Sequence, residues 1–105
     1  MARTVYNIVC KDGIKQISGY TFSTGNLKFG VSNQSPATGE NIVDWWVVTE
    51  LTTGYSCANG NTKKEAIGNI LKKDKLDIVT RYNKEHPHED VNADVFIQST
   101  YWGAW

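Results

Sequence analysis

The stretch WVVTELTTGYSCANGNTKKEAI, from Trp46 to Ile67, decides the fold. Its first part is rich in β-branched residues, which favour strands. Thr52-Thr53-Gly54 interrupts this pattern with small and polar residues, as expected of a turn between a strand over 42–51 and a shorter strand over 55–58. The stretch therefore begins as a β-hairpin.

The second part of the stretch predicts a helix. Thr62-Lys63-Lys64-Glu65 matches a capping box, in which the Thr62 hydroxyl accepts a hydrogen bond from the N–H of Glu65 and the Glu65 carboxylate accepts one from the N–H of Thr62. Apolar residues then recur at helical spacing: Ala66, Ile67, Ile70, Leu71, Ile78 and Tyr82. Lys73-Asp74-Lys75 interrupts this stripe, so the expected helix over 62–85 is either continuous or broken near 74.

Turn signals divide the rest of the chain into short strands. Asp12-Gly13 is a strong hairpin signal, Gly25-Asn26 marks the next turn, and residues 33–41 are polar enough for a long loop. Further strands are expected over 4–10, 14–22 (with a bulge at Gly19), 27–31 and 95–102.

These elements predict an α+β fold in a single domain over residues 1–105, because 105 residues are typical of one domain. We expect an antiparallel sheet of five or six strands with the helix packed on one face. The periodicity gives these core residues: Val5, Ile8, Ile17, Phe29, Val47, Ile67, Leu71 and Ile78.

Composition narrows the classes of function. Lys plus Arg and Asp plus Glu both total 11, so no net charge attracts the chain to nucleic acid or acidic lipid. No apolar run approaches the roughly 20 residues of a membrane span, and the first residues lack the pattern of a signal peptide, so we expect a cytoplasmic protein. Cys10 and Cys57 permit one disulfide, but two free thiols fit that compartment better.

Part of the opening stretch, over residues 48–54 and 62–67, resembles a sequence block from known groups of proteins. Val48, Thr49, Thr53 and Gly54, followed by Thr-Lys-Lys-Glu-Ala-Ile over 62–67, resemble a strand-turn-strand-helix block in small phage and mobile-element proteins. The block also looks like the strand-strand-helix layout of arm-type DNA-binding domains from phage integrases. The first resemblance implies a setting in which small proteins often bind and block host defence machinery.

Aromatic residues are the strongest indication of a binding surface. Neighbours on a strand point to opposite faces, so Trp45 and Trp46 cannot both enter one core, and Tyr101 and Trp102 diverge in the same way. Tryptophan is enriched at the energetic centres of protein interfaces. We therefore expect a partner-binding surface formed by Trp45, Trp46, Tyr101, Trp102 and Trp105. The alternatives are strand ends that fold back over the sheet, or a homodimer that buries these aromatic residues.

The helix offers a second kind of surface, because residues 62–85 carry an excess of positive charge. Lysines 63, 64, 72 and 73 would contact phosphates in a nucleic-acid-binding module, and each contact would make binding salt-dependent. Interspersed carboxylates also permit i, i+4 pairs on a solvated helix face. The candidate nucleic-acid residues are Lys63, Lys64, Lys72 and Lys73.

Signatures of enzymes and cofactors are missing from the sequence, which has no Gly-rich nucleotide-binding loop, no H-E-x-x-H and no G-x-S-x-G. His86, His88 and a neighbouring carboxylate lack the spacing of a zinc site, and a solvated turn explains them better. Asp44, Glu50 and Asp94 are carboxylates whose proximity the sequence does not indicate. We therefore expect a non-enzymatic binding protein with no metal or cofactor, such as a phage-type inhibitor or accessory factor, and a nucleic-acid-binding module as the alternative.

Overall fold

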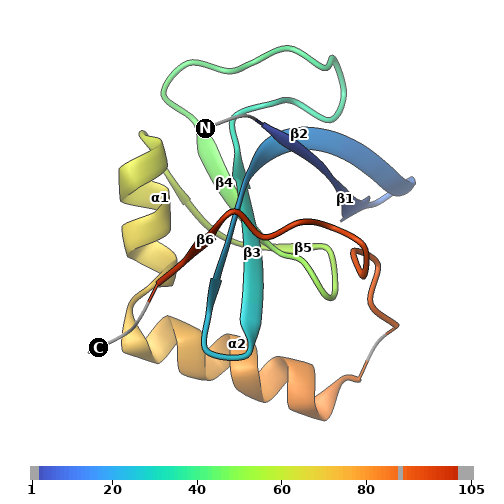
Figure 1. Ribbon diagram of the computed structural model, residues 1–105. Helices are drawn as coiled ribbons and strands as arrows, with labels where there is room; N and C mark the ends of the chain where they lie inside the picture. Colours follow the sequence, from blue (N-terminus) through green and yellow to red (C-terminus); the bar gives the residue numbers. More distant parts are fainter. Residues whose placement is uncertain (1–2, 88, 102–105) are drawn as a thin grey trace.

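The computed structural model describes residues 3–87 and 89–101 (Figure 1). Its elements follow in the order β1 (Thr4–Cys10), β2 (Gly13–Thr24), β3 (Leu27–Ser32), β4 (Trp46–Glu50), β5 (Tyr55–Gly60), α1 (Lys63–Ile70), α2 (Lys73–Glu85) and β6 (Ser99–Thr100). Strands β1 to β5 pair antiparallel with their neighbours in chain order, and β6 pairs parallel with β2. The predicted α+β class, the sheet of five or six strands and its helical cover are confirmed.

Strand β2 is long and curved, and it divides its pairing between two neighbours (Figure 1). Its first half pairs with β1 as far as Gly19, and its second half pairs with β3 from Tyr20 onward. The β1–β2 hairpin thereby curls over β3, and the ring of Tyr6 lies directly against the backbone of Gly30. A Cβ atom at Gly30 would lie 2.4 Å from Cζ of Tyr6, so the close approach of the two layers requires glycine.

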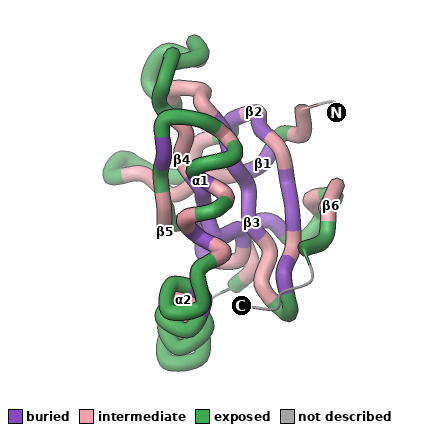
Figure 2. The backbone as a smooth tube through the Cα atoms, turned by 90° about the vertical axis from the view of Figure 1, so that its left-hand side faces the viewer, coloured by how far each residue is buried: buried purple, intermediate pink, exposed green. Residues whose placement is uncertain are grey.

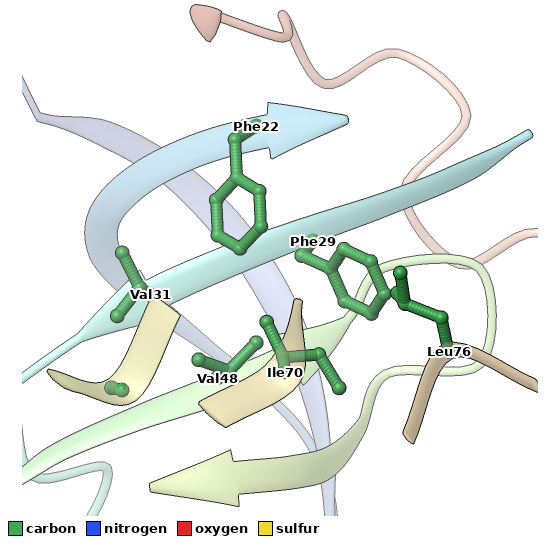
Figure 3. Packing of buried hydrophobic residues seen from close by; sticks show 7 residues of the cluster. Phe22, Phe29, Val31, Val48, Ile70 and Leu76 are labelled. Atoms are coloured by element: carbon green, nitrogen blue, oxygen red, sulfur yellow. The ribbon is translucent and has the colours of Figure 1, made fainter. Parts of the chain in front are cut away.

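The larger core lies between the sheet and the helices (Figure 3). Phe22 and Phe29 stack with ring centroids 5.4 Å apart, and Ile70 of α1 and Leu76 of α2 pack against the same cluster. The other buried members are Val31, Val48 and Ala66. This core exists because alternate residues of β2, β3 and β4 point to one face while α1 presents its apolar stripe to that face.

The opposite face of the sheet is partly covered by the chain after α2. Tyr6, Ile17 and Leu51 form a second buried cluster, against which Val95 and Ile97 pack. This segment was expected to form a strand over 95–102, but of its described residues, 95–101, only Ser99–Thr100 forms a strand that pairs with the sheet. Side-chain hydrogen bonds hold it instead: the Thr21 hydroxyl donates to the carbonyl of Phe96 and accepts from the N–H of Gln98.

Two other boundaries differ from the sequence prediction. The strand expected over 42–51 begins only at Trp46, because Asp44 adopts φ 58°, a left-handed conformation that a strand does not contain. Gly19 stays in register opposite Thr4, and the irregularity lies instead where β4 pairs with β5, between Val48 and Thr49. The expected bulge at Gly19 is therefore wrong.

Helix α1 ends at Ile70 and α2 begins at Lys73, so the break in the helical region lies slightly before residue 74. The Thr62 hydroxyl accepts from the N–H of Glu65 at 3.0 Å, as the capping box predicts. The Glu65 carboxylate accepts from the N–H of Asn61 at 3.4 Å, one residue before the expected donor.

The core prediction is right for Ile17 and Phe29, which are buried, while Ile8, Val47, Ile67 and Leu71 are half-buried. It is wrong for Val5 and Ile78, which are exposed. Val5 lies on the outer face of the β1–β2 hairpin, where the described chain places no second layer. Ile78 is exposed because α2 packs on the core through Leu76 and Val79, and a residue two positions after Leu76 lies on nearly the opposite side of the helix.

Candidate interaction surface

The adjacent indoles Trp45 and Trp46 lie in different environments, although only Trp46 belongs to β4. Trp46 is half-buried and packs against the core beneath the helices. Trp45 is 46% exposed and lies at the end of the long loop that precedes β4. Of the two, Trp45 is the residue that solvent or a partner can reach.

Tyr101 lies far from Trp45 along the sheet. Its N–H donates to the carbonyl of Ser23 at 2.8 Å, and its ring meets Phe22 edge-on with centroids 5.4 Å apart. Ser23 pairs with the start of β3, whereas Trp45 precedes the β4 residues that pair with the end of β3. Trp102 and Trp105 lie outside the described residues. The structure therefore does not gather Trp45, Trp46 and Tyr101 into one patch.

Trp46 instead belongs to a cluster of rings and cations. Tyr20 stacks on Trp46 with centroids 6.5 Å apart, and the Arg3 guanidinium lies 5.3 Å from the Tyr20 ring and 5.9 Å from the Trp46 ring. Lys63, the first residue of α1, places its Nζ 4.2 Å from the centroid of Tyr20. The contact of Lys63 with Tyr20 stabilises the start of the helix against the sheet, and those of Arg3 hold the residue before β1 over the same rings.

Helix α2 carries the apolar surface that the sequence did not identify as exposed. Leu76 is its buried residue, whereas Ile78 is 58% exposed and Tyr82 is 40% exposed. Figure 2 shows α2 projecting below the body of the protein with most of its length exposed. The Tyr82 ring meets Tyr55 of β5 edge-on at 6.5 Å, so the apolar surface continues from the helix onto the sheet.

Two hollows run along β5 beside this surface. One, of about 430 Å³, extends from Trp45 to Lys72, and the other, of about 350 Å³, extends from Tyr55 to Tyr82 and Ile78. Ser56, Cys57 and Lys75 line both hollows. We call the combined surface the β5–α2 groove; its defining residues are Trp45, Tyr55, Cys57, Lys72, Lys75, Ile78 and Tyr82.

The groove is basic. Lys72 and Lys75 line it, and both are exposed. The ion pairs of the described residues, Lys15–Asp12 and Lys28–Asp90, involve neither of them. Glu50 also lines the groove, but it is buried, and its carboxylate accepts from the N–H groups of Thr52 and Thr53 at 2.8 and 2.9 Å. The groove therefore presents two ammonium groups beside apolar side chains.

Cys57, at the floor of the groove, is poorly suited to nucleophilic chemistry. Burial raises the pKa of its thiol to about 12, with a further contribution from the negative charge of Glu50. The thiolate, which is the reactive form, is therefore scarce at neutral pH. Cys57 and Cys10 are both free, as expected.

The four helix lysines that were considered for nucleic acid differ in environment. Lys63 is half-buried over Tyr20, while Lys64, Lys72 and Lys73 are exposed. Within the described residues, none of the four forms an ion pair, so the i, i+4 pairs that would neutralise the helix face are not present. These lysines remain available for an acidic ligand of either kind, protein or nucleic acid.

The histidine and carboxylate residues do not converge where the structure describes them. His86 stacks on Tyr82 with ring centroids 4.4 Å apart, and His88 lies outside the described residues. Glu50 is occupied by the turn that follows it, while Asp44 and Asp94 are exposed. Over 3–87 and 89–101, no three His, Cys, Asp or Glu residues gather as a metal site would require.

The exposed stripe of α2 was missed because a single helix over 62–85 would have placed Ile78 and Tyr82 on the same face as Ile70. The available signal was Lys73-Asp74-Lys75, since an interruption of the stripe permits a change of helix direction.

None of the described helices is both long enough and apolar enough to cross a membrane. Comparison of the chain with protein-family models, curated proteins and solved structures finds no match.

Proposed function

We propose that this protein is a non-enzymatic binding protein that acts by contact with another protein, and that the β5–α2 groove is its contact surface. The observation that carries the proposal is the outward apolar stripe of α2, formed by Ile78 and Tyr82 beside Tyr55. A helix in a small domain normally buries its stripe, and apolar surface that stays exposed next to a groove is typical of an interaction site.

The chemistry of the groove specifies the kind of partner. Lys72 and Lys75 favour a segment with carboxylates, while the stripe favours large apolar side chains. Complete burial of a side chain such as Ile78 contributes about 1.5–3 kcal/mol. The partner segment is therefore acidic and carries one or two large apolar residues. Of the predicted aromatic residues that the structure describes, Trp45 lies at the far end of the groove and contributes to the contact.

The role that fits such a surface is that of an inhibitor or accessory factor, which works by occupying a partner and not by chemical change. The phage-type resemblance of residues 46–67 suggests the same role. A homodimer is the alternative use of the surface, and sedimentation equilibrium distinguishes it, since a second copy on the groove would double the mass at micromolar concentration.

The test compares Ile78→Asp with the matched variant Ile14→Asp, because both isoleucines are exposed but Ile14 lies on the β1–β2 hairpin. Each protein is used to capture partners from extract, and each captured protein is then purified and titrated by calorimetry. We expect a partner that binds wild type and Ile14→Asp equally and loses at least about tenfold in affinity for Ile78→Asp. Equal binding by all three proteins would place the contact elsewhere.

A nucleic-acid-binding module is the second candidate, and the unpaired helix lysines favour it. Its test is titration with short single- and double-stranded DNA and RNA at increasing salt. Tight binding that weakens steeply with salt, and that weakens further in Lys64→Ala and Lys73→Ala, would replace the protein-binding proposal. We expect no binding at physiological salt, because the groove joins its two lysines to apolar side chains and not to a longer phosphate track.

A further inference from the structure

The inner face of the curled sheet is only partly filled. Register places Tyr6 and Ile8 of β1, Ile17 of β2, and Val47 and Thr49 of β4 on this face. Near Tyr6, the cluster with Ile17 and Leu51 and the segment containing Val95 and Ile97 fill the interior. Near Val47, residues 33–36 and Ile42 of the loop before β4 line the interior without filling it.

The unfilled part is a cavity of about 220 Å³. Five strands contribute to its wall, through Ile8, Cys10, Ile17, Ser32, Val47 and Ser56. Its lining contains no Asp, Glu, Lys, Arg or His, so a charged ligand would find no counterion there. Ser32, the most deeply buried hydroxyl among these six, already donates to the carbonyl of Ser18 and accepts from the N–H of Gln34.

The loop between β3 and β4 forms the mouth of this cavity. Ile42 and Trp45 line the cavity and are also exposed, which is the expected arrangement for side chains at an entrance. Asp44 between them has φ 58°, a costly conformation for a residue other than glycine. Asn33 holds the base of the loop, since its carbonyl accepts from the N–H of Ile42 at 2.7 Å.

Side chain hydrogen bonds keep the loop over the cavity. The N–H of Ser18 donates to Oε1 of Gln34 at 2.7 Å, and Nε2 of Gln34 donates to the carbonyl of Gly39 at 2.9 Å. The Arg3 guanidinium also donates to Oδ1 of Asn33 at 2.8 Å. These hydrogen bonds fix the mouth of the cavity to β2 on one side, and the mouth is open at Ile42 and Trp45.

From this geometry we propose that the cavity binds a small, neutral, mostly apolar molecule that contains a single ring or two fused rings. An enclosed apolar cavity of about 150 Å³ accepts benzene, and this larger, partly open one, whose lining is apolar with several uncharged polar residues, has room for a bicyclic ring system. The absence of ionisable groups other than the Cys10 thiol from the lining selects neutral over anionic forms of the same ring. None of the α2 residues lines this cavity, so it is distinct from the apolar stripe of α2, but it adjoins the β5–α2 groove, since Trp45, Val47 and Ser56 line both.

Titration of the isotope-labelled full chain with indole, followed by NMR of its methyl groups, tests the proposal. We expect saturable shifts of Ile8, Ile17 and Val47, and none at Ile78, which lies on α2. Indole-3-acetate serves as the anionic probe of similar shape and is expected to bind at least about tenfold more weakly. Shifts confined to Ile78, or no saturable shift up to the solubility limit of indole, would overturn the proposal.

A matched pair of variants locates the site. Val47→Phe adds volume inside the cavity, and Val5→Phe adds the same volume on the exposed outer face of β1. We expect Val47→Phe to weaken indole binding at least about tenfold and Val5→Phe to leave it within about twofold of wild type. Val47 also lines the hollow between Trp45 and Lys72, whereas Cys10 lines the cavity and neither hollow of the groove. Cys10→Leu is therefore the second filling variant: it distinguishes the two sites and serves also where Val47→Phe does not fold. Unchanged indole affinity in the folded filling variant would contradict the site.

Discussion

Asn7 and Asn92 exchange hydrogen bonds across 85 residues of sequence: the N–H of Asn7 donates to Oδ1 of Asn92 at 2.7 Å, and Nδ2 of Asn92 donates to the carbonyl of Asn7 at 2.9 Å. Nδ2 of Asn92 also donates to the carbonyl of Leu51 at 2.7 Å. A single amide thus pairs with β1 and with the turn after β4. The Asn92 side chain thus fixes the segment after α2 to the sheet, although the described strand of that segment, Ser99–Thr100, has only two residues.

Asn92→Ala is expected to lower the free energy of unfolding by about 2–4 kcal/mol. Asn92 is only 2% exposed, and its loss removes hydrogen-bond partners from the part-buried backbone of Asn7 and from the buried carbonyl of Leu51. Urea denaturation measures the change. Asn41→Ala, in the exposed loop, is the control and is expected to stay within about 0.5 kcal/mol of wild type. Similar effects of the two variants would show that the amide of Asn92 does not anchor the segment.

Gly30→Ala and Gly68→Ala should change stability in opposite directions. A methyl group at Gly30 meets the Tyr6 ring at 2.4 Å, whereas one at Gly68 has nothing within 4 Å. We expect Gly30→Ala to destabilise the protein by about 2 kcal/mol or more through overpacking. Gly68→Ala, inside α1, should stabilise it by about 0.5–1 kcal/mol. Thermal unfolding measures both, and a tolerated Gly30→Ala would contradict the close contact with Tyr6.

Leu76→Ala and Ile78→Ala separate the two faces of α2. Leu76 is buried against Phe29 and its neighbours, so we expect its truncation to cost about 2–4 kcal/mol. Ile78 is exposed, so its truncation should cost less than about 0.5 kcal/mol, as for other surface positions. Chemical denaturation of both variants provides the measurement. A large loss for Ile78→Ala would mean that α2 packs through the face that we assign to a partner.

The Cys57 thiol should make stability fall at alkaline pH. Burial raises its pKa from 9.0 to about 12 in the folded chain, so between these values the unfolded chain loses the proton more readily. The contribution is complete below pH 9 and is lost as pH rises toward 12, at about 1 kcal/mol per pH unit. Cys57→Ala should therefore show a shallower decline than wild type in denaturation experiments from pH 8 to 11. Parallel declines would indicate that the thiol is not buried.

Local signals in the sequence were sufficient for most of the elements. The Asp12-Gly13 hairpin, the Thr52–Gly54 turn and the Thr62 cap all depend on contacts between residues close in sequence, and the structure contains each of them. The prediction that Trp45 and Trp46 would not both enter one core is confirmed, although Trp45 precedes β4 and the alternation of a strand is not the cause. These features depend on backbone geometry and on hydrogen bonds between residues close in sequence. The identity of each residue restricts both directly.

What only the tertiary structure decided is where each face of an element points. The stripe of Ile67, Leu71, Ile78 and Tyr82 is regular in sequence, yet after the break between α1 and α2 it is Leu76 and not Ile78 that faces the core. Likewise, no local pattern announces that β2 bends from β1 to β3, or that Asn92 pairs with Asn7. Apolar burial is proportional to area and has no preferred direction, so a sequence specifies which surfaces are apolar, while the packing of all elements together determines which of them remain exposed for a partner or a ligand.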